Sequence, residues 1–179
     1  MRVIGGEFRR RTLKSLPGMD VRPTPDRLRE SLFNVLAPRM AGVVFADLYA
    51  GTGAVGIEEL SRGAEKAIFV EQKFAAVRAI RENLRSLEIA DRAEVRQARA
   101  TAMIPHIAAD IVFLDPPYAL ENEYSSALEL LGANPPALVI AQHPRRLKLA
   151  ETYGALRRTR VLKQGDNELS FFTPQSPTD

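Results

Sequence analysis

The amino-acid sequence predicts a doubly wound α/β fold in a single domain, and three observations lead to this prediction. First, short apolar runs alternate with helical patterns from residue 43 onward. Second, these runs are apolar on both faces, which is typical of parallel strands that are covered by helices on both sides of a sheet. Third, a chain of 179 residues, of which 45% are hydrophobic, has the size and composition of one soluble domain with a full core.

The predicted strands and helices follow each other in a regular order. The expected parallel strands cover residues 43–48, 67–71, 93–95, 110–115 and 137–142, with helical patterns at 54–62, 74–88 and 122–132 between them. Residues 156–163 and 168–173 predict an antiparallel pair, because turn-forming residues lie at 165–167. The sheet is therefore expected to end in antiparallel strands at one edge.

The segment ahead of the first strand has its own pattern. Its first stretch, RVIGGEFRRRTL, predicts a small hairpin around the glycine pair. A helix is predicted to begin at Thr24, because this hydroxyl cap precedes Pro25 and Asp26, and helical spacing continues to Pro38. We therefore expect a basic extension that packs on the core (1–40), a main domain (41–174) and a disordered tail (175–179).

Composition excludes several classes of function. The chain has no Cys and only two His, so it offers no disulfide framework, no thiol nucleophile and no cysteine- or histidine-based metal centre. The first residues lack the apolar core of a signal peptide, and no apolar run approaches the ~18 residues of a membrane span. The sequence therefore predicts a cytoplasmic protein that binds no metal.

The charge is distributed unevenly along the chain. Residues 1–40 contain nine Lys and Arg against four acids, which gives +5, so the remaining residues carry 3 − 5 = −2. A basic arm on a near-neutral body predicts a polyanionic partner, and a solubilising tail is the alternative. The residues that we assign to nucleic-acid binding are Arg9, Arg10, Arg11, Arg22 and Arg27.

A glycine-rich loop follows the first predicted strand. The sequence Asp47-Leu-Tyr49-Ala-Gly51-Thr-Gly53-Ala-Val-Gly56 matches the GxGxxG nucleotide fingerprint in the required strand–loop–helix context. Glu71 ends the second strand, where a carboxylate can accept both hydroxyl hydrogens of an adenosine ribose. The alternative for the glycines alone is a tight turn with close helix packing. Together the two features predict an adenosine-bearing cofactor, and NAD, FAD and S-adenosylmethionine all fit.

The turn after the fourth strand separates these cofactors. A hydride transferase has no evident need for Asp115-Pro116-Pro117-Tyr118 at this strand end, whereas an amine methyltransferase does. The Asp115 carboxylate and the Pro116 carbonyl can accept both hydrogens of a nucleobase amine and aim its lone pair at a sulfonium methyl. Tyr118 can stack on a base swung out of its helix. A carboxylate of ordinary pKa would suffice, and the alternative is a proline-rich turn with a capping Asp.

Four stretches carry a resemblance to a known family: RVIGGEFRRRTL, RPTPDRLRESLFNVL, DLYAGTGAVGIEELSRGA and IVFLDPPY. With them, the chain resembles the bacterial small-subunit (16S) ribosomal RNA (guanine-N2)-methyltransferases of the RsmD type over almost its full length. The resemblance implies a Rossmann-like S-adenosylmethionine-dependent methyltransferase fold with a mostly parallel seven-stranded sheet, an antiparallel edge strand and a short basic N-terminal extension. It also implies methyl transfer to N2 of a guanine, within the small ribosomal subunit or an assembly intermediate, by a monomer.

The resemblance also assigns residues. The cofactor site is expected to include Asp47, Tyr49, Gly51, Gly53, Glu71, Ala100 and Asp115, and the catalytic residues are Asp115, Pro116 and Tyr118. Arg22, Thr24 and Arg27 match the family's RPT-x-D-R segment near the cofactor and the RNA entrance. The chain departs from many relatives after the third strand, where Gln97-Ala-Arg99-Ala100 replaces the Asp or Asn that reads adenine. That contact is left to backbone groups or to Gln97.

Other functions stay open at this point. A DNA adenine-N6 or cytosine-N4 methyltransferase shares the chemistry, although sequence-specific DNA enzymes generally need an added recognition region. A protein-glutamine methyltransferase usually has Asn at the position of Asp115. An NAD-dependent oxidoreductase and a catalytically silent RNA-binding module belong to different classes.

Overall fold

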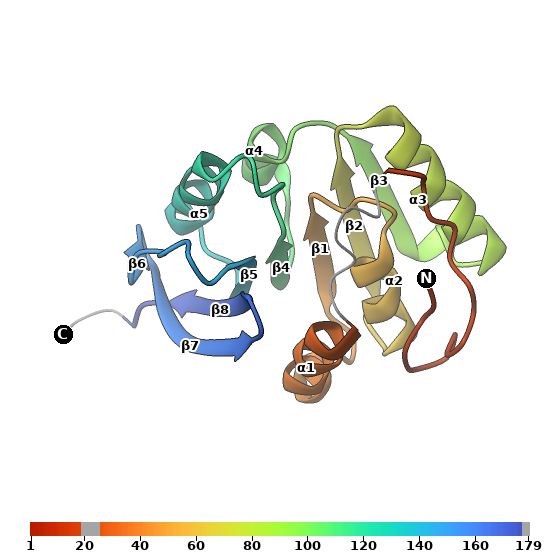
Figure 1. Cartoon of the computed structure of the whole chain (residues 1–179), viewed down its shortest axis with the longest axis horizontal. Helices are drawn as coiled ribbons and strands as arrows, with labels where there is room; N and C mark the ends of the chain where they lie inside the picture. The colour runs from red at the N-terminus through yellow and green to blue at the C-terminus, as the bar shows by residue number, and fades with distance from the viewer. Residues whose placement is uncertain (19–25, 177–179) are drawn as a thin grey trace.

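The computed structural model describes residues 1–18 and 26–176 (Figure 1). One twisted sheet runs through the molecule, with the strand order β3-β2-β1-β4-β5-β8-β7-β6. The first five strands are parallel: β1 (Val44–Leu48), β2 (Lys66–Glu71), β3 (Ala93–Gln97), β4 (Ile111–Leu114) and β5 (Leu138–Pro144). The chain order reverses at β1, which lies between β2 and β4, and such a reversal creates a ligand crevice at the carboxyl ends of the strands.

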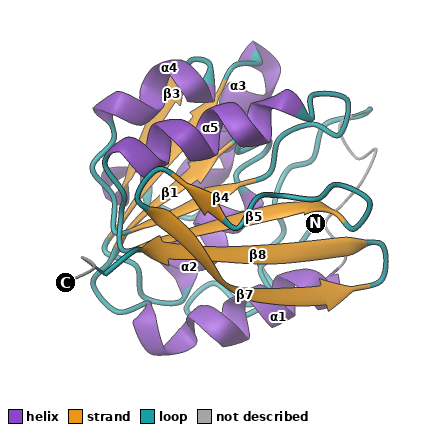
Figure 2. Cartoon of the chain, turned by 90° about the vertical axis from the view of Figure 1, so that its left-hand side faces the viewer, coloured by secondary structure: helices purple, strands orange, loops and turns teal. Residues whose placement is uncertain are grey.

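The far edge of the sheet is antiparallel. It consists of β8 (Asn167–Pro174), β7 (Leu156–Gln164) and the two-residue β6 (Thr152–Tyr153), and Figure 2 shows β8 beside β5 and β7 beside β8. The antiparallel pair and its turn were predicted from the sequence and are confirmed. The number of seven strands was wrong: within the described residues the sheet has eight, because the short β6 adds one at the edge, where β5, β8, β7 and β6 pair with one another in antiparallel fashion.

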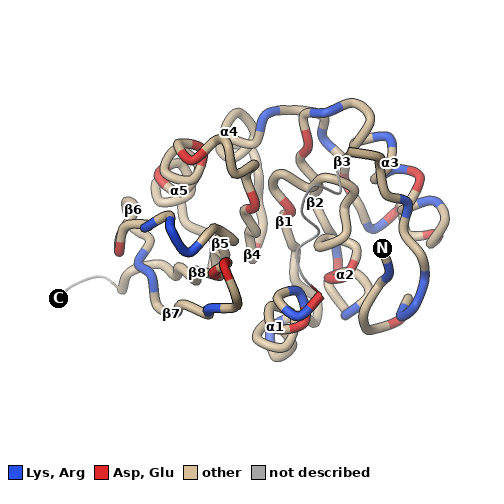
Figure 3. Tube along the Cα trace, in the orientation of Figure 1, with Lys and Arg blue, Asp and Glu red and all other residues tan. Residues whose placement is uncertain are grey.

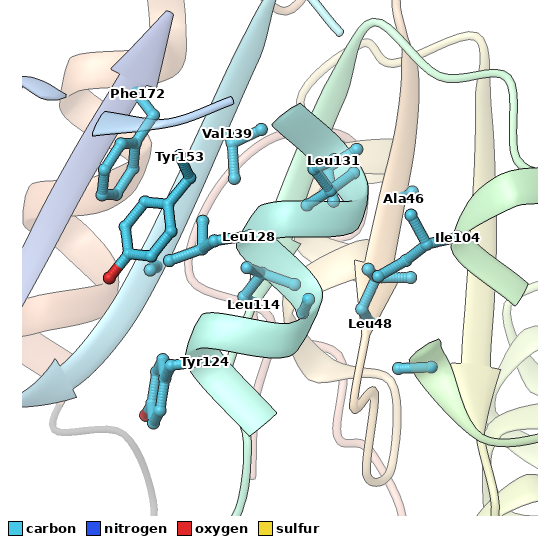
Figure 4. Close-up of a cluster of buried hydrophobic side chains, with 14 of the residues drawn as sticks. Ala46, Leu48, Ile104, Leu114, Tyr124, Leu128, Leu131, Val139, Tyr153 and Phe172 are labelled. Carbon is cyan, nitrogen blue, oxygen red and sulfur yellow. The ribbon is translucent and has the colours of Figure 1, made fainter. Parts of the chain in front are cut away.

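Helices cover both faces of the sheet, as the doubly wound prediction required. On one face lie α1 (Asp26–Leu36), α2 (Ala54–Ser61) and α3 (Phe74–Ser86), and their apolar residues pack against strand side chains such as Phe45 and Phe69. The other face carries the four-residue α4 (Ala100–Met103) and α5 (Asn122–Ala133). Leu114 and Val139 of the sheet belong to one buried cluster with Tyr124, Leu128 and Leu131 of α5 (Figure 4).

The N-terminal segment folds as a short hairpin that packs on the far ends of two helices. Arg2 and Thr12 form an antiparallel bridge. The backbone N–H of Glu7 donates to the carbonyl of Ser61, the last residue of α2, and the Arg11 guanidinium donates to the carbonyl of Ser86, the last residue of α3. Both helices begin near the carboxyl ends of the parallel strands and end near their amino ends. The hairpin contacts the last residues of the helices, so it lies toward the amino ends of the strands.

After the hairpin, the chain approaches the glycine loop. The buried amide of Asn83 accepts a hydrogen bond from the Lys14 N–H at 2.7 Å and donates to the Thr52 carbonyl at 3.1 Å. Buried Glu58 of α2 accepts the N–H groups of Ile4 and Gly5 at 2.8 and 2.7 Å. These contacts fix the N-terminal segment to the helices that flank the crevice. Within the described residues, no helix is long and apolar enough to cross a bilayer.

Candidate active site

Three chain segments meet where β2, β1 and β4 end side by side. They are the glycine loop after β1, the end of β2 at Glu71, and the Asp115–Tyr118 turn after β4. The predicted strand-end residues therefore come together at the reversal point of the sheet, because parallel neighbours present their carboxyl ends at one edge.

The three fingerprint glycines have different roles. Gly51 has a φ of +59°, and a Cβ added to it would meet no atom within 4 Å, so it borders open space. A Cβ on Gly56 would lie 2.4 Å from the Phe69 ring, and one on Gly53 would lie 3.3 Å from the same ring. Gly51 therefore leaves room for a ligand, whereas Gly53 and Gly56 allow α2 to pack closely on β2.

Asp47 lies beneath this loop. Its side chain is buried, and its Oδ2 accepts the Gly56 N–H at 3.0 Å. Burial, together with the nearby charges of Asp115 and Glu71, raises the pKa of Asp47 well above its ordinary value, although the Gly56 hydrogen bond opposes the shift. In this structure Asp47 fixes the start of α2.

Tyr49 has a left-handed backbone, with a φ of +62°, which is uncommon for a residue with a side chain. Its hydroxyl donates to Glu123 Oε2 on α5 at 2.6 Å, and Glu123 Oε1 lies 3.5 Å from the Arg99 guanidinium. Burial and the Glu123 carboxylate raise the pKa of Tyr49. This chain of contacts connects the glycine loop to α5 and to the segment after β3.

Glu71 fixes the backbone on two sides of the crevice. One carboxylate oxygen accepts the Gly51 N–H at 2.9 Å, and the other accepts the Lys73 N–H at 2.9 Å. Each carboxylate oxygen can accept a second hydrogen bond, so both oxygens keep acceptor capacity. The side chain is 8% exposed. Glu71 therefore combines a structural role with the capacity to bind a diol.

The turn after β4 presents two oxygen acceptors. Neither the Asp115 carboxylate nor the Pro116 carbonyl accepts a hydrogen bond from any residue that the structure describes. Although Asp115 is only partly buried, protein atoms crowd its carboxyl group, and this desolvation raises its pKa to about 7. A carboxylate of ordinary pKa would have sufficed for the chemistry, and the sequence does not show how closely this carboxyl group is enclosed.

Tyr118 closes the turn against the antiparallel edge of the sheet. It is half-buried, and its hydroxyl donates to Asn167 Oδ1 at 2.6 Å. Asn167 is the first residue of β8, so this bond connects the turn to the β7–β8 hairpin. The bond restricts the orientation of the ring beside the two acceptors.

A buried polar layer beneath the turn was missed by the sequence reasoning. The Tyr124 hydroxyl donates to the Gln142 carbonyl at 2.6 Å, and the ring of buried His143 lies edge-on to Tyr124. His143 Nε2 is 2.8 Å from Ser170 Oγ, and burial lowers the pKa of His143. The signal was the polar pair Gln142-His143 at the end of an apolar run. The layer lies close to the turn, because burial and then the nearby charges of Asp115 and Tyr118 raise the pKa of Tyr124.

The segment after β3 contributes only partly to the crevice. The Ala98 N–H donates to the Glu71 carbonyl at 3.1 Å, which holds this segment against β2. Ala100 is buried at the start of α4, whereas Gln97 is exposed. The adenine contact that was left to Gln97 or to backbone groups stays a prediction.

The basic residues assigned to nucleic-acid binding lie in two places. Arg9, Arg10 and Arg11 are exposed on the N-terminal hairpin, toward the amino ends of the parallel strands and away from the crevice. Arg27 is exposed in the first turn of α1, and the Ser31 hydroxyl, one turn later, donates to the Gln164 side chain at the end of β7. Arg22 and the Thr24 cap lie outside the described residues.

Solved structures share this fold over most of the chain. "Putative methyltransferase yhhF from Escherichia coli" superposes with a TM-score of 0.86 and is 28% identical, with 98% of each chain covered. An RNA methyltransferase from Salinibacter ruber in complex with S-adenosyl-L-homocysteine superposes with a TM-score of 0.63 at 18% identity, over 88% of this chain and 98% of that one. The Rossmann-like methyltransferase fold is thereby confirmed, and the chain belongs to this class.

Sequence comparisons give the family. The model of the family described as "Conserved hypothetical protein 95" matches residues 1–173. "Putative rRNA methyltransferase YlbH" of Bacillus subtilis is 39% identical over 170 residues, which are 89% of this chain and 91% of that protein. "Ribosomal RNA small subunit methyltransferase D" of Escherichia coli is 40% identical over 66% of this chain and 60% of its own length. The chain belongs to this family, and the resemblance to the RsmD-type enzymes is confirmed.

Proposed function

We propose that this protein transfers a methyl group from S-adenosylmethionine to the exocyclic N2 of a guanine in small-subunit ribosomal RNA. One observation carries the proposal: Asp115 and Pro116 hold two oxygen acceptors beside each other without a hydrogen-bond donor among the described residues. An exocyclic amine has two hydrogens to donate. Family membership, and relatives whose names specify ribosomal RNA, support the substrate class.

The residues of the crevice fit S-adenosylmethionine. Open space beside Gly51 leaves room for a ligand at the glycine loop, and Glu71 keeps acceptor capacity for ribose hydroxyls. When bound, the cofactor supplies an electrophilic methyl group on a sulfonium. The Asp115 turn follows β4, next to β1, so the amine acceptors lie close to the glycine loop. The methyltransferase family favours this cofactor over NAD and FAD.

The turn can activate a poor nucleophile by positioning it. The lone pair of a nucleobase amine is delocalised into the ring, and hydrogen bonds from both amine hydrogens draw the nitrogen toward tetrahedral geometry. Pro116 and Pro117 restrict the backbone, so the Pro116 carbonyl is oriented before the substrate binds. Fixed dipoles and a defined position then supply most of the acceleration. After transfer, the cationic amine can give a proton to the Asp115 carboxylate.

The substrate is proposed to be the small ribosomal subunit or an assembly intermediate, bound by a monomer in the cytoplasm. The exposed arginines of the N-terminal hairpin and Arg27 are proposed to contact phosphates. Sequence-specific RNA recognition mostly targets unpaired bases that can be splayed out of a loop, and Tyr118 is proposed to stack on the flipped guanine.

Nucleoside analysis of ribosomal RNA tests the proposal. Small-subunit RNA from a strain that lacks this gene is digested and compared with the parent by chromatography and mass spectrometry. We expect one N2-methylguanosine to disappear, and to return with the wild-type gene but not with Asp115→Ala. Unchanged methylguanosine, or loss of a methylated adenine or cytosine, would contradict the proposal. Supplying purified subunits and their extracted RNA with labelled cofactor then separates the two substrate forms.

A further inference from the structure

A second group of cations lies beside the catalytic turn, on the antiparallel edge of the sheet. Residues 144–174 contain seven Lys and Arg and three acids, so this segment carries 7 − 3 = +4 although the chain outside residues 1–40 is −2 overall. Figure 3 shows these cations along β7 and in the loop that follows β5. The members of the segment's cation set are Arg145, Arg146, Lys148, Arg157, Arg158, Arg160 and Lys163.

Hydrogen bonds place part of this cation set next to the Asp115–Tyr118 turn. The Arg145 N–H donates to the Asp166 carbonyl at 2.8 Å, and its guanidinium donates to the Gly165 carbonyl at 3.1 Å. The next residue in the chain, Asn167, accepts the Tyr118 hydroxyl. Arg146 pairs with Glu121, which follows Tyr118 by three residues. The β7–β8 turn, the loop after β5 and the catalytic turn therefore form one continuous surface.

The cations nearest the turn are available to a ligand. The side chains of Arg145 and Arg146 are 49% and 67% exposed. Lys163, at the end of β7, is exposed as well. The acidic partners are weak competitors: Glu168 lies 4.0 Å from Arg145, and exposed pairs such as Arg146–Glu121 contribute only about 0–1 kcal/mol. By contrast, Arg158 is 20% exposed and pairs with Glu151.

We infer that Arg145, Arg146 and Lys163, which we call the β7–β8 basic surface, bind the RNA phosphates that flank the target nucleotide. The inference rests on the proposed function. A base can reach the Asp115–Pro116 acceptors only if its own backbone passes the rim of the crevice, and this rim includes the β7–β8 turn. Arginines 9–11 lie toward the amino ends of the parallel strands, away from the crevice, so they would contact a more distant part of the RNA.

Salt-dependent RNA binding tests the surface. The variant Arg146→Ala/Lys163→Ala is compared with Arg39→Ala/Lys66→Ala, which removes the same charges at the amino ends of β1 and β2. Arg145 is kept, because its guanidinium donates a hydrogen bond to the Gly165 carbonyl and so holds the β7–β8 turn. The probe is small-subunit RNA from the deletion strain. We expect the first variant to lose about tenfold in affinity at low salt, and its log–log salt slope to fall by about 1.5, while the control stays near wild type.

Equal slopes for the two variants would overturn the inference. Circular dichroism and binding of S-adenosylhomocysteine report whether each variant is folded, and Arg146→Gln alone serves if the double variant is not. The salt slope does not depend on methyl transfer. If the wild type methylates no RNA, the proposed function fails while the slopes still decide whether this surface binds phosphates.

Cross-linking places the surface relative to the target. The chain has no Cys, so Lys163→Cys and Arg39→Cys each create a single attachment point for a photoactivatable cross-linker. We expect adducts from position 163 within a few nucleotides of the modified guanine, and adducts from position 39 elsewhere or absent. Adducts from position 163 that lie far from the modified guanine, or no adducts, would contradict the assigned position.

Discussion

The carboxylate of Glu71 accepts a hydrogen bond from the backbone N–H of Gly51, 2.9 Å away, and so connects the end of β2 to the glycine loop after β1. The same carboxylate holds the Lys73 N–H at the start of α3. The residue that is expected to bind the cofactor ribose therefore also shapes the loop beside it. Removing the carboxylate should affect both functions.

Glu71→Ala should weaken binding of S-adenosylhomocysteine by about 1–3 kcal/mol, the scale of lost hydrogen bonds to a charged group. Isothermal titration calorimetry measures this change. The control is Glu65→Ala, an exposed acid at the amino end of β2. If Glu71→Ala binds the ligand as tightly as the control, Glu71 does not contact the ribose.

Asp115→Ala should reduce methyl transfer by at least about 100-fold, the scale observed when one preorganised hydrogen-bonding group is removed from an active site. Cofactor affinity should stay nearly unchanged, because the described side-chain hydrogen bonds to the backbone of the glycine loop and the start of α2 come from Glu71, Asp47 and Asn83 and not from Asp115. Transfer of labelled methyl groups to RNA and calorimetry give the two readouts. Asp91→Ala, at an exposed acid after α3, is the matched control, and an active Asp115→Ala enzyme would remove the assigned role.

The raised pKa of Asp115 predicts a pH-dependent rate. Burial raises this pKa from 3.8 to about 7, so the carboxyl group is neutral below about pH 7 and ionised above it. Only the ionised form accepts both the amine hydrogen bond and the released proton. We expect kcat/KM to rise about tenfold per pH unit up to about pH 7 and then to level off. A flat profile between about pH 6 and pH 8, with RNA binding unchanged, would argue against this role.

The same group should make the free energy of unfolding depend on pH in the opposite direction. The folded-state pKa lies above the ordinary value of 3.8, so the folded protein binds this proton more tightly than the unfolded chain does. Stability from this group is therefore present below about pH 4 and lost as the pH rises to about 7. Urea unfolding of wild type and Asp115→Asn across this range isolates the effect. A difference that is constant with pH would contradict the shifted pKa.

Local motifs allowed much of the site to be predicted. The Gly51 loop and the Asp115 turn each depend on neighbouring residues in the chain, and their places after β1 and β4 follow from apolar runs that end there. The side-chain partners of these residues could not be predicted. Tyr118 and Asn167 are 49 residues apart, and the enclosure that shifts the Asp115 pKa comes from the packed structure.

The fold was predicted least well where elements are short. Strand β6 has two residues and α4 has four, and neither length gives a measurable period in the hydrophobic pattern. The location of the N-terminal hairpin depends on contacts such as Glu58 with Ile4, between residues 54 positions apart. Charge composition predicted a basic arm but did not show whether it lies near the carboxyl ends or the amino ends of the parallel strands.

Replacing Tyr118 separates its hydroxyl group from its ring. Tyr118→Phe loses the hydrogen bond to Asn167 and should lower the free energy of unfolding by about 1 kcal/mol, with most of the methyl transfer retained. Tyr118→Ala also removes the stacking surface, which is worth about 1–3 kcal/mol per base, so kcat/KM for RNA should fall about 10- to 100-fold. If the two variants lose the same activity, the ring does not stack on the substrate.

Alanine at Gly56 should mainly lower stability, whereas alanine at Gly51 should mainly weaken ligand binding. Gly56→Ala places a Cβ 2.4 Å from the Phe69 ring and should lower the free energy of unfolding by about 1–3 kcal/mol, the usual result of overpacking. Gly51→Ala meets no atom within 4 Å, and its φ of +59° costs about 1 kcal/mol. Its added methyl group points into the space assigned to the ligand, so it should weaken binding of S-adenosylhomocysteine more than Gly56→Ala does. Thermal unfolding and calorimetry on both variants decide this, and tighter or equal binding by Gly51→Ala would show that this space is not the cofactor site.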